Sequence, residues 1–292
     1  MISYDPKDLL TPDLHNYLLS AVAPRPIAFA STIDEDGNPN LSPFSFFNVF
    51  SANPPILIFS PARRVRNNTT KHTLENVELV KEVVINVVNY DIVQQMSLSS
   101  TEYPESVNEF KKAGLTMLKS DKVQPFRVAE SPIQLECKVN EIIKLGTEGG
   151  AGNLVICEVV KLHMKDEILD ENGKINQVAL DLVARAGGSY YSRAKDGFFE
   201  IPKPLSTLGI GVDKLPDSVR KSSILSGNDL GILGNLAAFP NEMEIAAFIA
   251  ITDNKSDYSQ EEKIVHQRAK RLIETGNAEQ ALLLLLAKER TK

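Results

Sequence analysis

The sequence contains no tryptophan and only two cysteines among its 292 residues. Cys137 and Cys157 each lie within an apolar, strand-like run, without a Cys-x-x-Cys spacing or a nearby pair of histidines. This pattern excludes a disulfide framework and a cysteine-based zinc site, because both need clustered cysteines. We therefore predict two reduced thiols buried in the core.

Histidine is scarce as well, with four residues in the whole chain. They are spread along the sequence at His15, His72, His163 and His266. No two of them share a metal-ligand spacing, and neither a Ser-His-Asp arrangement nor an acid/base dyad can be recognised. The sequence thus predicts no metal centre and offers no hydrolytic machinery.

An excess of positive charge and a long apolar run are also missing. Acidic residues outnumber basic ones by 38 to 32, so no overall positive field attracts nucleic acid or anionic lipid. No apolar run approaches the about 20 residues that span a bilayer. The first residues, Met1 to Asp8, lack the charged-then-apolar pattern of a signal peptide. We expect a cytoplasmic protein that binds neither nucleic acid nor membrane.

The composition, with 42% hydrophobic and 24% charged residues, is that of an ordinary globular protein with a full core. Its length accommodates one large domain with an appendage. Strand-like runs dominate up to about residue 170, and the helices between them do not alternate regularly. We therefore predict a mainly β fold with inserted helices, an antiparallel barrel or sheet, over residues 1–194. Residues 195–292 are predicted to form a C-terminal extension.

The predicted strands alternate in hydrophobicity or are bounded by turn residues. Residues 27–33 and 40–48 are expected to form a hairpin around the Asp34–Pro39 turn. Further strands are expected at 56–60, 83–88, 133–145 and 153–164, with one helix beginning near Thr70 and another over 91–115.

The extension begins with a segment rich in glycine and proline, residues 195–240. Within it, Gly227–Gly234 lacks both the G-x-G-x-x-G spacing and a surrounding βαβ unit, so we interpret it as a loop. Residues 259–275 and 278–290 predict a helical hairpin. Its apolar stripe, Leu282–Leu286, has to pack on the barrel, a partner subunit or another protein, with core packing the simplest case.

The basic residues gather in one short segment, Ser60–Thr73, which runs from a predicted strand end into a predicted helix start. It contains Arg63, Arg64, Arg66, Lys71 and His72 together with hydroxyl side chains. Backbone N–H groups at a helix N-terminus, guanidinium groups and hydroxyls all favour a bound phosphate. The competing interpretation is a solvated charged loop.

A second notable run, Ser42–Phe50, carries four phenylalanines with Ser45 and Asn48 between them. A planar heterocycle needs an apolar wall and hydrogen-bond partners at its edge, and this run offers both. The alternative is that these phenylalanines belong to the core.

Several short motifs follow one another along the first two thirds of the chain. They are Pro24-Arg-Pro-Ile-Ala-Phe-Ala-Ser-Thr32, Asp36-Gly-Asn-Pro-Asn-Leu-Ser-Pro-Phe-Ser-Phe-Phe-Asn48, Phe59-Ser-Pro-Ala-Arg-Arg64, Lys71-His-Thr-Leu-Glu-Asn76, Gly149-Gly-Ala-Gly-Asn-Leu154 and Arg185-Ala-Gly-Gly-Ser-Tyr-Tyr191. In order and spacing, the chain resembles flavin reductase-like proteins of the FMN-binding split-barrel superfamily, in their flavoredoxin-like branch. The resemblance extends to about residue 193.

This resemblance implies a six-stranded split barrel that works as a homodimer, with FMN near the subunit interface. It implies that the run from Ser42 to Asn48 lines the isoalloxazine ring, through Ser45, Phe46, Phe47 and Asn48. It also implies that the ribityl phosphate is surrounded by Ser60, Arg63, Arg64, Lys71 and Thr73. His72 replaces the acidic residue expected there in this branch, so it either contacts the phosphate or lies exposed on the helix.

Proteins of this kind take hydride from NADH or NADPH onto bound flavin and pass electrons to free flavin, ferric complexes or a partner protein. The resemblance therefore implies an NAD(P)H-dependent flavin oxidoreductase. One alternative is a non-catalytic flavin-binding electron carrier whose C-terminal segment covers the nicotinamide approach. Another is an interaction module whose helical hairpin recruits a partner.

Two further residues are candidates for this site. His163 lies at the end of the predicted strand after the glycine-rich loop. The resemblance makes it the one candidate catalytic residue, close to the nicotinamide. The alternative is a histidine whose hydrogen bonds are made within the protein and which has no role in the reaction. The Gly-Asp-His pattern of two-component monooxygenase reductases is absent, because Gly152-Asn-Leu154 stands in its place. Arg185 and the glycines after it either close the pocket or form a turn at the dimer interface.

Overall fold

The computed structural model describes residues 1–104, 107–201, 208–251 and 258–291. The chain divides into two compact units, Met1–Phe199 and Glu200–Lys292. The sequence suggested a boundary after residue 194, and the assignment of the two parts as separate domains stays a prediction.

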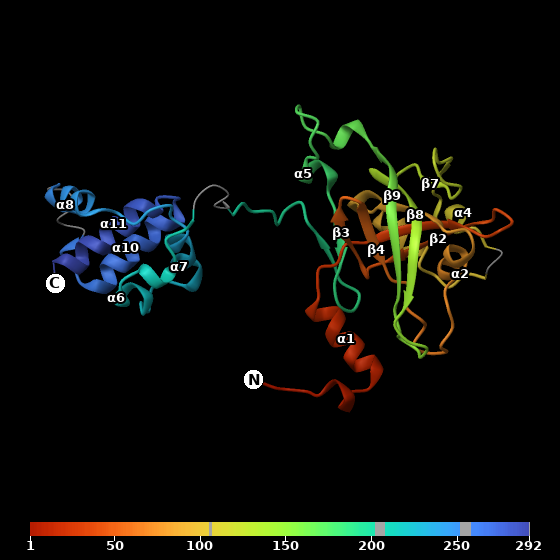
Figure 1. The fold of residues 1–292 in the computed structure, drawn as a ribbon, viewed down its shortest axis with the longest axis horizontal. Coiled ribbons are helices and arrows are strands. Elements are labelled where there is room, and N and C mark those ends of the chain that lie inside the picture. The colour runs from red at the N-terminus through yellow and green to blue at the C-terminus, as the bar shows by residue number, and fades with distance from the viewer. Residues whose placement is uncertain (105–106, 202–207, 252–257, 292) are drawn as a thin grey trace. The chain divides into compact units, whose positions relative to one another are not determined.

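The first unit is built on an antiparallel sheet of seven strands in the order β2-β1-β5-β8-β9-β4-β3 (Figure 1). Their bounds are β1 (Ala28–Ile33), β2 (Pro39–Phe44), β3 (Phe47–Ala52), β4 (Pro55–Phe59), β5 (Glu82–Val87), β8 (Ile133–Lys144) and β9 (Asn153–Met164). The two outer strands, β2 and β3, are joined only by Ser45 and Phe46. Such a link reaches about 11 Å when fully extended. The sheet therefore curls back on itself into a barrel that is open between β2 and β3.

The strand predictions are confirmed with one exception. The β1–β2 hairpin, β4, β5 and the long β8–β9 hairpin all lie where the hydrophobic pattern placed them. The continuous strand expected over 40–48 is wrong, because β2 pairs with β1 whereas β3 pairs with β4. The chain crosses from one barrel edge to the other at Ser45, which ends the first pairing. Two short hairpins were not predicted: β6 (Met117–Leu118) with β7 (Arg127–Val128), and β10 (Val183–Arg185) with β11 (Tyr191–Arg193).

The helices of this unit are short and fill the connections between strands. They are α1 (Thr11–Ala21), α2 (His72–Leu79), α3 (Val93–Leu98), α4 (Glu109–Ala113) and α5 (Gln177–Leu180), with single 3-10 turns η1 (Pro6–Asp8), η2 (Tyr90–Ile92) and η3 (Asp166–Ile168). The single helix expected over 91–115 is wrong. Pro104 cannot continue a helix, and Asn108 starts α4 afresh by accepting a hydrogen bond from the Lys111 N–H.

The barrel interior is filled by aromatic and β-branched side chains of the sheet, including Phe44, Phe59 and Ile85. Cys137 and Cys157 belong to the same core, and both are fully buried and free. The predicted pair of reduced core thiols is thereby confirmed.

The second unit is helical. Its elements are η4 (Val212–Lys214), α6 (Asp217–Arg220), α7 (Gly227–Gly234), α8 (Glu242–Ala250), α10 (Glu262–Glu274) and α11 (Ala278–Arg290). The predicted helical hairpin is confirmed as α10 and α11, with Gly276 between them at a φ of 80°. A left-handed residue after a helix favours glycine, which explains the sharp turn.

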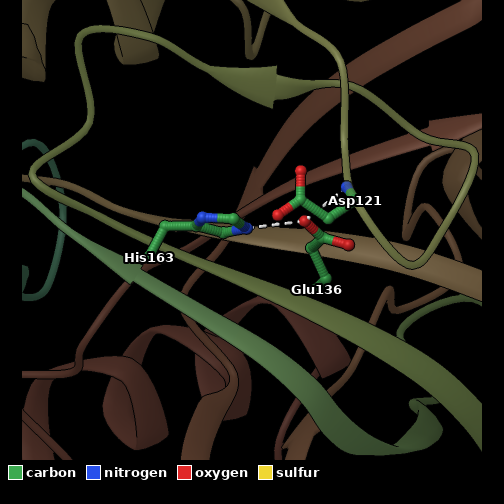
Figure 2. Close-up of side chains that lie close together, drawn as sticks. All are labelled: Asp121, Glu136 and His163. Atoms are coloured by element: carbon green, nitrogen blue, oxygen red, sulfur yellow. Dashed lines mark hydrogen bonds and ion pairs between the residues drawn. The ribbon is translucent and has the colours of Figure 1, made fainter.

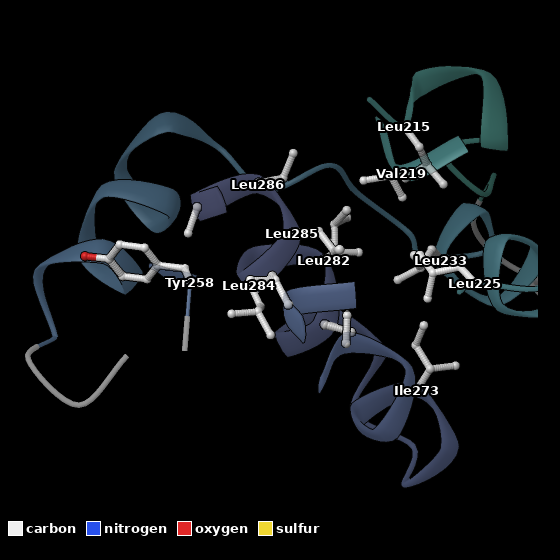
Figure 3. Packing of buried hydrophobic residues seen from close by; sticks show 14 of the residues in the cluster. Leu215, Val219, Leu225, Leu233, Tyr258, Ile273, Leu282, Leu284, Leu285 and Leu286 are labelled. Carbon is white, nitrogen blue, oxygen red and sulfur yellow. The ribbon is translucent and has the colours of Figure 1, made fainter. Parts of the chain in front are cut away.

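One interpretation of this part of the sequence was wrong, and another is confirmed. Gly227–Gly234 is helix α7 rather than a loop, because Ser226 and Asp229 form a reciprocal capping box at its start. The core packing favoured for the stripe Leu282–Leu286 is confirmed, and the core is that of the second unit itself, shared with Val219 and Leu233 (Figure 3). The second unit thus has a separate hydrophobic core. None of the described helices is long and apolar enough to cross a membrane.

Candidate functional site

Most of the predicted phosphate-binding residues gather at the start of α2. A small polar cavity there lies against β2 and the loop that follows α3. Its lining includes side chains from both the basic segment and β2, namely Asn40, Ser42, Arg64, Lys71, His72 and Thr73. His72 therefore lies at the cavity as the first residue of α2.

Lys71 is the residue that most strongly indicates an anionic ligand. Burial, together with the nearby charge of Arg64, lowers the pKa of its ammonium group. Among the described residues, no carboxylate lies within ion-pair distance of Lys71, and its ammonium group lies 5.5 Å from the centre of the Phe44 ring. A partly buried cation without a counter-ion is less well solvated than one at the open surface. A bound anion would remove this penalty.

Arg64 supplies the second charge of the cavity. Its guanidinium donates to Thr69 Oγ1 at 2.9 Å and to the Thr70 carbonyl. Its buried Nε lies 3.3 Å from a Glu102 oxygen but has no partner with hydrogen-bond geometry. Because Glu102 also pairs with Arg66, its carboxylate neutralises Arg64 only in part.

Glu109 of α4 is the other carboxylate at this cavity, and the sequence gave no sign of its role. It is almost fully buried and accepts the Leu41 N–H at 3.1 Å. Burial raises the pKa of its carboxyl group, and among the described residues no ion pair joins Glu109 to Lys71 or Arg64.

Ser60 and Arg63 do not line this cavity. Ser60 Oγ accepts the Asn153 N–H at 3.0 Å, and Arg63 donates to the side-chain and backbone oxygens of Asn68 at 2.6 Å each. The backbone at Gly152 approaches the Ser60 side chain closely, because a Cβ atom at position 152 would lie 2.9 Å from Ser60 Oγ. The Arg63 backbone also donates to the Ala151 carbonyl and accepts the Gly150 N–H, so both predicted residues hold the glycine-rich loop against the basic segment.

A larger cavity of about 170 Å³ lies further along β2. Pro43, Ser45, Arg185 and Tyr191 contribute to its lining, and Ser100 lines both this cavity and the polar one. The two are therefore neighbours. Arg185 donates to the Gly188 carbonyl at 2.6 Å, and no described carboxylate lies within ion-pair distance of it.

The remaining residues of the aromatic run point elsewhere. Phe46 is exposed, with its ring 6.3 Å from that of His15, and Phe47 packs against the barrel core. Asn48 is exposed, and its side-chain oxygen accepts the Val49 N–H at 2.8 Å. Of the four residues predicted to line a flavin ring, the structure places only Ser45 at the cavity.

Sequence reasoning missed Arg25, which organises this corner of the barrel. Arg25 is buried and donates to the Leu19 and Val22 carbonyls at the end of α1 and, at 3.4 Å, to Ser45 Oγ. Burial, and then the charge of Arg185, lower its pKa. The sequence marks Arg25 only by the two prolines beside it, Pro24 and Pro26. Its hydrogen-bond partners depend on tertiary structure, which no local pattern reveals.

His163 lies in a different cluster, on β9 beside β8 (Figure 2). Its Nε2 is 2.6 Å from Oε1 of the fully buried Glu136, which also accepts the N–H groups of Asp121 at 2.9 Å and Lys122 at 2.6 Å. Burial favours a higher pKa for Glu136, but these hydrogen bonds outweigh it and hold the pKa below its usual range. His163 lines neither of the two cavities described above.

Asp121, Glu136 and His163 bring three potential metal-ligating atoms within 4.8 Å of one another. The oxygens of Glu136 already accept three hydrogen bonds, and Asp121 lies 3.9 Å from the Lys161 ammonium. A metal ion would have to displace these partners. The arrangement fits a structural latch that holds the loop before β7 against the sheet.

A curled antiparallel sheet with one opening between its outer strands is the architecture of a split-barrel protein. Residues 20–183, more than half of the chain, match the flavin reductase like domain, and the protein belongs to this family of flavin-related oxidoreductases. The family and the split-barrel fold expected from the sequence are thereby confirmed, although the described sheet has seven strands rather than the six that the resemblance implied.

Similar proteins cover up to about two thirds of the chain. An uncharacterized protein of Aquifex aeolicus is 38% identical over 181 residues, which are 62% of this chain and 90% of that protein. Nitrilotriacetate monooxygenase component B from Bacillus cereus is 27% identical, with a TM-score of 0.63 over 70% of this chain and 98% of that one. A protein of Shewanella frigidimarina, described as a flavin reductase with a split barrel domain, is 26% identical, with a TM-score of 0.58 over 70% and 100%. At least 30% of this chain has no counterpart in these three proteins, because each of them covers no more than 70% of its residues.

Proposed function

We propose that the protein binds FMN at the two neighbouring cavities along β2 and transfers hydride from NADH or NADPH, through the flavin, to an acceptor. The observation that carries the proposal is the pair of cations, Lys71 and Arg64, at one cavity without full compensation by carboxylates. A dianionic phosphate monoester supplies the charge that this corner lacks.

The residues present fit FMN at both ends. Lys71, Arg64 and the Thr73 hydroxyl would hold the phosphate, with the His72 ring at its edge. The cavity at Ser45 and Arg185, adjacent along β2, would take the ring system. FMN, when bound, supplies the hydride acceptor, so the chain itself has to position rings and exclude water rather than provide an acid or base.

A homodimer and a cytoplasmic location belong to the same proposal. Support for the homodimer comes from β3, where Val49 and Phe50 expose 64% and 63% of their surface. Neighbouring apolar residues at the edge of a sheet commonly mark a protein interface.

The test is the visible absorption spectrum of the purified protein, first with added FMN and then after NADH or NADPH without oxygen. We expect the spectrum of a bound flavin and its bleaching by at least one coenzyme. A protein that stays colourless in excess FMN contradicts flavin binding. Binding without bleaching by either coenzyme favours an electron carrier over a reductase.

A further inference from the structure

A third cavity in the first unit, of about 180 Å³, has no part in the function proposed above. It lies between the η2–α3 segment and the β10–β11 hairpin, and its apolar lining comes from Tyr90, Val93, Val183 and Tyr191. A protein cavity of about 150 Å³ holds a benzene-sized ring. This cavity, which is open to solvent, therefore has room for one planar ring system.

Tyr191 is the wall between this cavity and the 170 Å³ cavity proposed for the flavin ring, because it lines both. The Arg185 guanidinium lies 4.6 Å from the centre of the Tyr191 ring and lines the flavin cavity. Hydride transfer needs reacting atoms about 3–3.5 Å apart. A ring in the third cavity is separated by Tyr191 from a flavin ring in the neighbouring cavity and is too far away to transfer hydride to it. The third cavity therefore suits a part of the reductant that is bound but takes no part in the reaction.

The walls of this cavity carry little net charge. Arg193 lies 3.8 Å from the centre of the Tyr90 ring, and its guanidinium pairs with both carboxylate oxygens of Asp181, at 2.8 and 2.5 Å. The Asp181 carboxylate thus neutralises Arg193. Arg185, across Tyr191, has no such partner among the described residues. A neutral ring next to an anionic group matches this distribution of charge.

The polar lining favours one particular ring. Gln94, Ser97 and Ser192 line the cavity with an amide and two hydroxyls. A glutamine amide presents one donor and one acceptor, which pair with the N6 and N7 atoms of adenine. Aromatic side chains add stacking for a nucleobase.

We infer that the third cavity binds the adenine base of the nicotinamide coenzyme, with Arg185 contacting its phosphates. This inference rests on the proposed function, because the coenzyme is the reductant of the flavin. The adenine end then anchors the coenzyme while the nicotinamide reaches the flavin cavity around Tyr191.

The experiment measures binding of ADP-ribose by calorimetry, which needs no electron transfer, with FMN titrated in parallel. The wild-type chain is expected to bind both. Gln94→Ala should weaken ADP-ribose binding at least about fivefold, the lower end for a bidentate amide contact to adenine. Val93→Phe should abolish it by filling the cavity, with the FMN affinity of both variants unchanged. Leu98→Ala is the control, since Leu98 is an exposed residue of the same helix that does not line the cavity.

The outcomes separate the two proposals. FMN binding without ADP-ribose binding, or ADP-ribose binding that Gln94→Ala and Val93→Phe leave unchanged, overturns the adenine site and leaves the proposed function standing. Failure to bind FMN overturns the proposed function itself. AMP and IMP refine the result, because the wild type should prefer AMP through its exocyclic amino group and Gln94→Ala should lose that preference.

Discussion

Arg64 and Lys71 line the same cavity, and the charge of Arg64 adds to burial in lowering the pKa of Lys71. The carboxylates nearby compensate this pair only in part, since Glu102 is shared with Arg66 and no ion pair joins Glu109 to either cation among the described residues. The cavity is therefore prepared for an anion at a cost to the free protein. This relationship yields three predictions about ligand binding.

Lys71→Ala should weaken FMN binding about 10- to 100-fold and riboflavin binding less than about threefold. The reason is that a hydrogen bond to a charged group contributes about 1.5–3 kcal/mol, and riboflavin lacks the phosphate. Fluorescence titration with both flavins measures the two affinities. Lys138→Ala, at an exposed lysine of β8, is the matched control. Equal losses for the two flavins contradict the phosphate assignment.

As the pH rises, FMN affinity should begin to fall at a lower pH than the deprotonation of an ordinary lysine would cause. The pKa of Lys71 is lowered in the free protein, and a bound phosphate raises it again because it adds negative charge. Affinity is therefore complete below the free-protein pKa of Lys71 and declines as the pH rises through it. Titrations from neutral pH to about pH 10, just below the usual lysine pKa, detect the decline. Lys71→Arg should remove it, because arginine stays charged. A wild-type affinity that is constant over this range argues against Lys71 as the phosphate ligand.

Glu102→Gln should strengthen FMN binding by up to about fivefold. Glu102 holds Arg64 and Arg66 in ion pairs and so competes with an incoming phosphate for the same charge. The effect is modest because Glu102 is 43% exposed, and such pairs contribute about 0.2–1 kcal/mol. Fluorescence titration at low and high salt measures it, with the difference between wild type and variant shrinking as salt screens the pair. Weaker binding by the variant would show that Glu102 supports the ligand instead.

The sequence predicted the parts of the site that depend on local chemistry. Lys71 and Thr73 lie at the start of a helix that follows a strand, so their grouping is a property of one continuous segment. Asn40 and Glu109 join them only because β2 and α4 pack against that segment, which no local pattern reveals. Arg63 shows the converse, since its neighbour Arg64 reaches the cavity whereas its own side chain is used by Asn68.

Packing also explains why the segment Gly227–Gly234 was wrongly interpreted as a loop. Gly227–Gly234 contains three glycines, which disfavour a helix by about 1 kcal/mol each. The Ser226–Asp229 capping box and burial of Leu233 outweigh that tendency in the folded unit. Packing within a helical unit, rather than propensity, decides the structure there.

Leu282→Ala should destabilise the second unit without changing FMN affinity. Leu282 is fully buried in the core of that unit, and removing such a side chain costs about 2–5 kcal/mol. Thermal unfolding followed by circular dichroism should show a helical transition at lower temperature, whereas flavin titration at low temperature should match the wild type. The exposed Met243→Ala, in α8, is the control for stability. A parallel loss of FMN binding contradicts the view that each unit has its own core.

Glu136→Gln should destabilise the first unit by about 2–4 kcal/mol at neutral pH, because its buried carboxylate accepts three hydrogen bonds that a neutral amide satisfies poorly. The pKa of Glu136 is lowered in the folded state, so its contribution is complete above the unfolded-state pKa and is lost as the pH falls through the folded one. Urea unfolding at a series of pH values should therefore show the wild type and the variant converging in acid. His163→Ala should follow the same pattern with a smaller loss, and flavin affinity should not change in either. A His163→Ala variant with wild-type stability but impaired flavin reduction would instead return His163 to the catalytic role that its sequence position suggested.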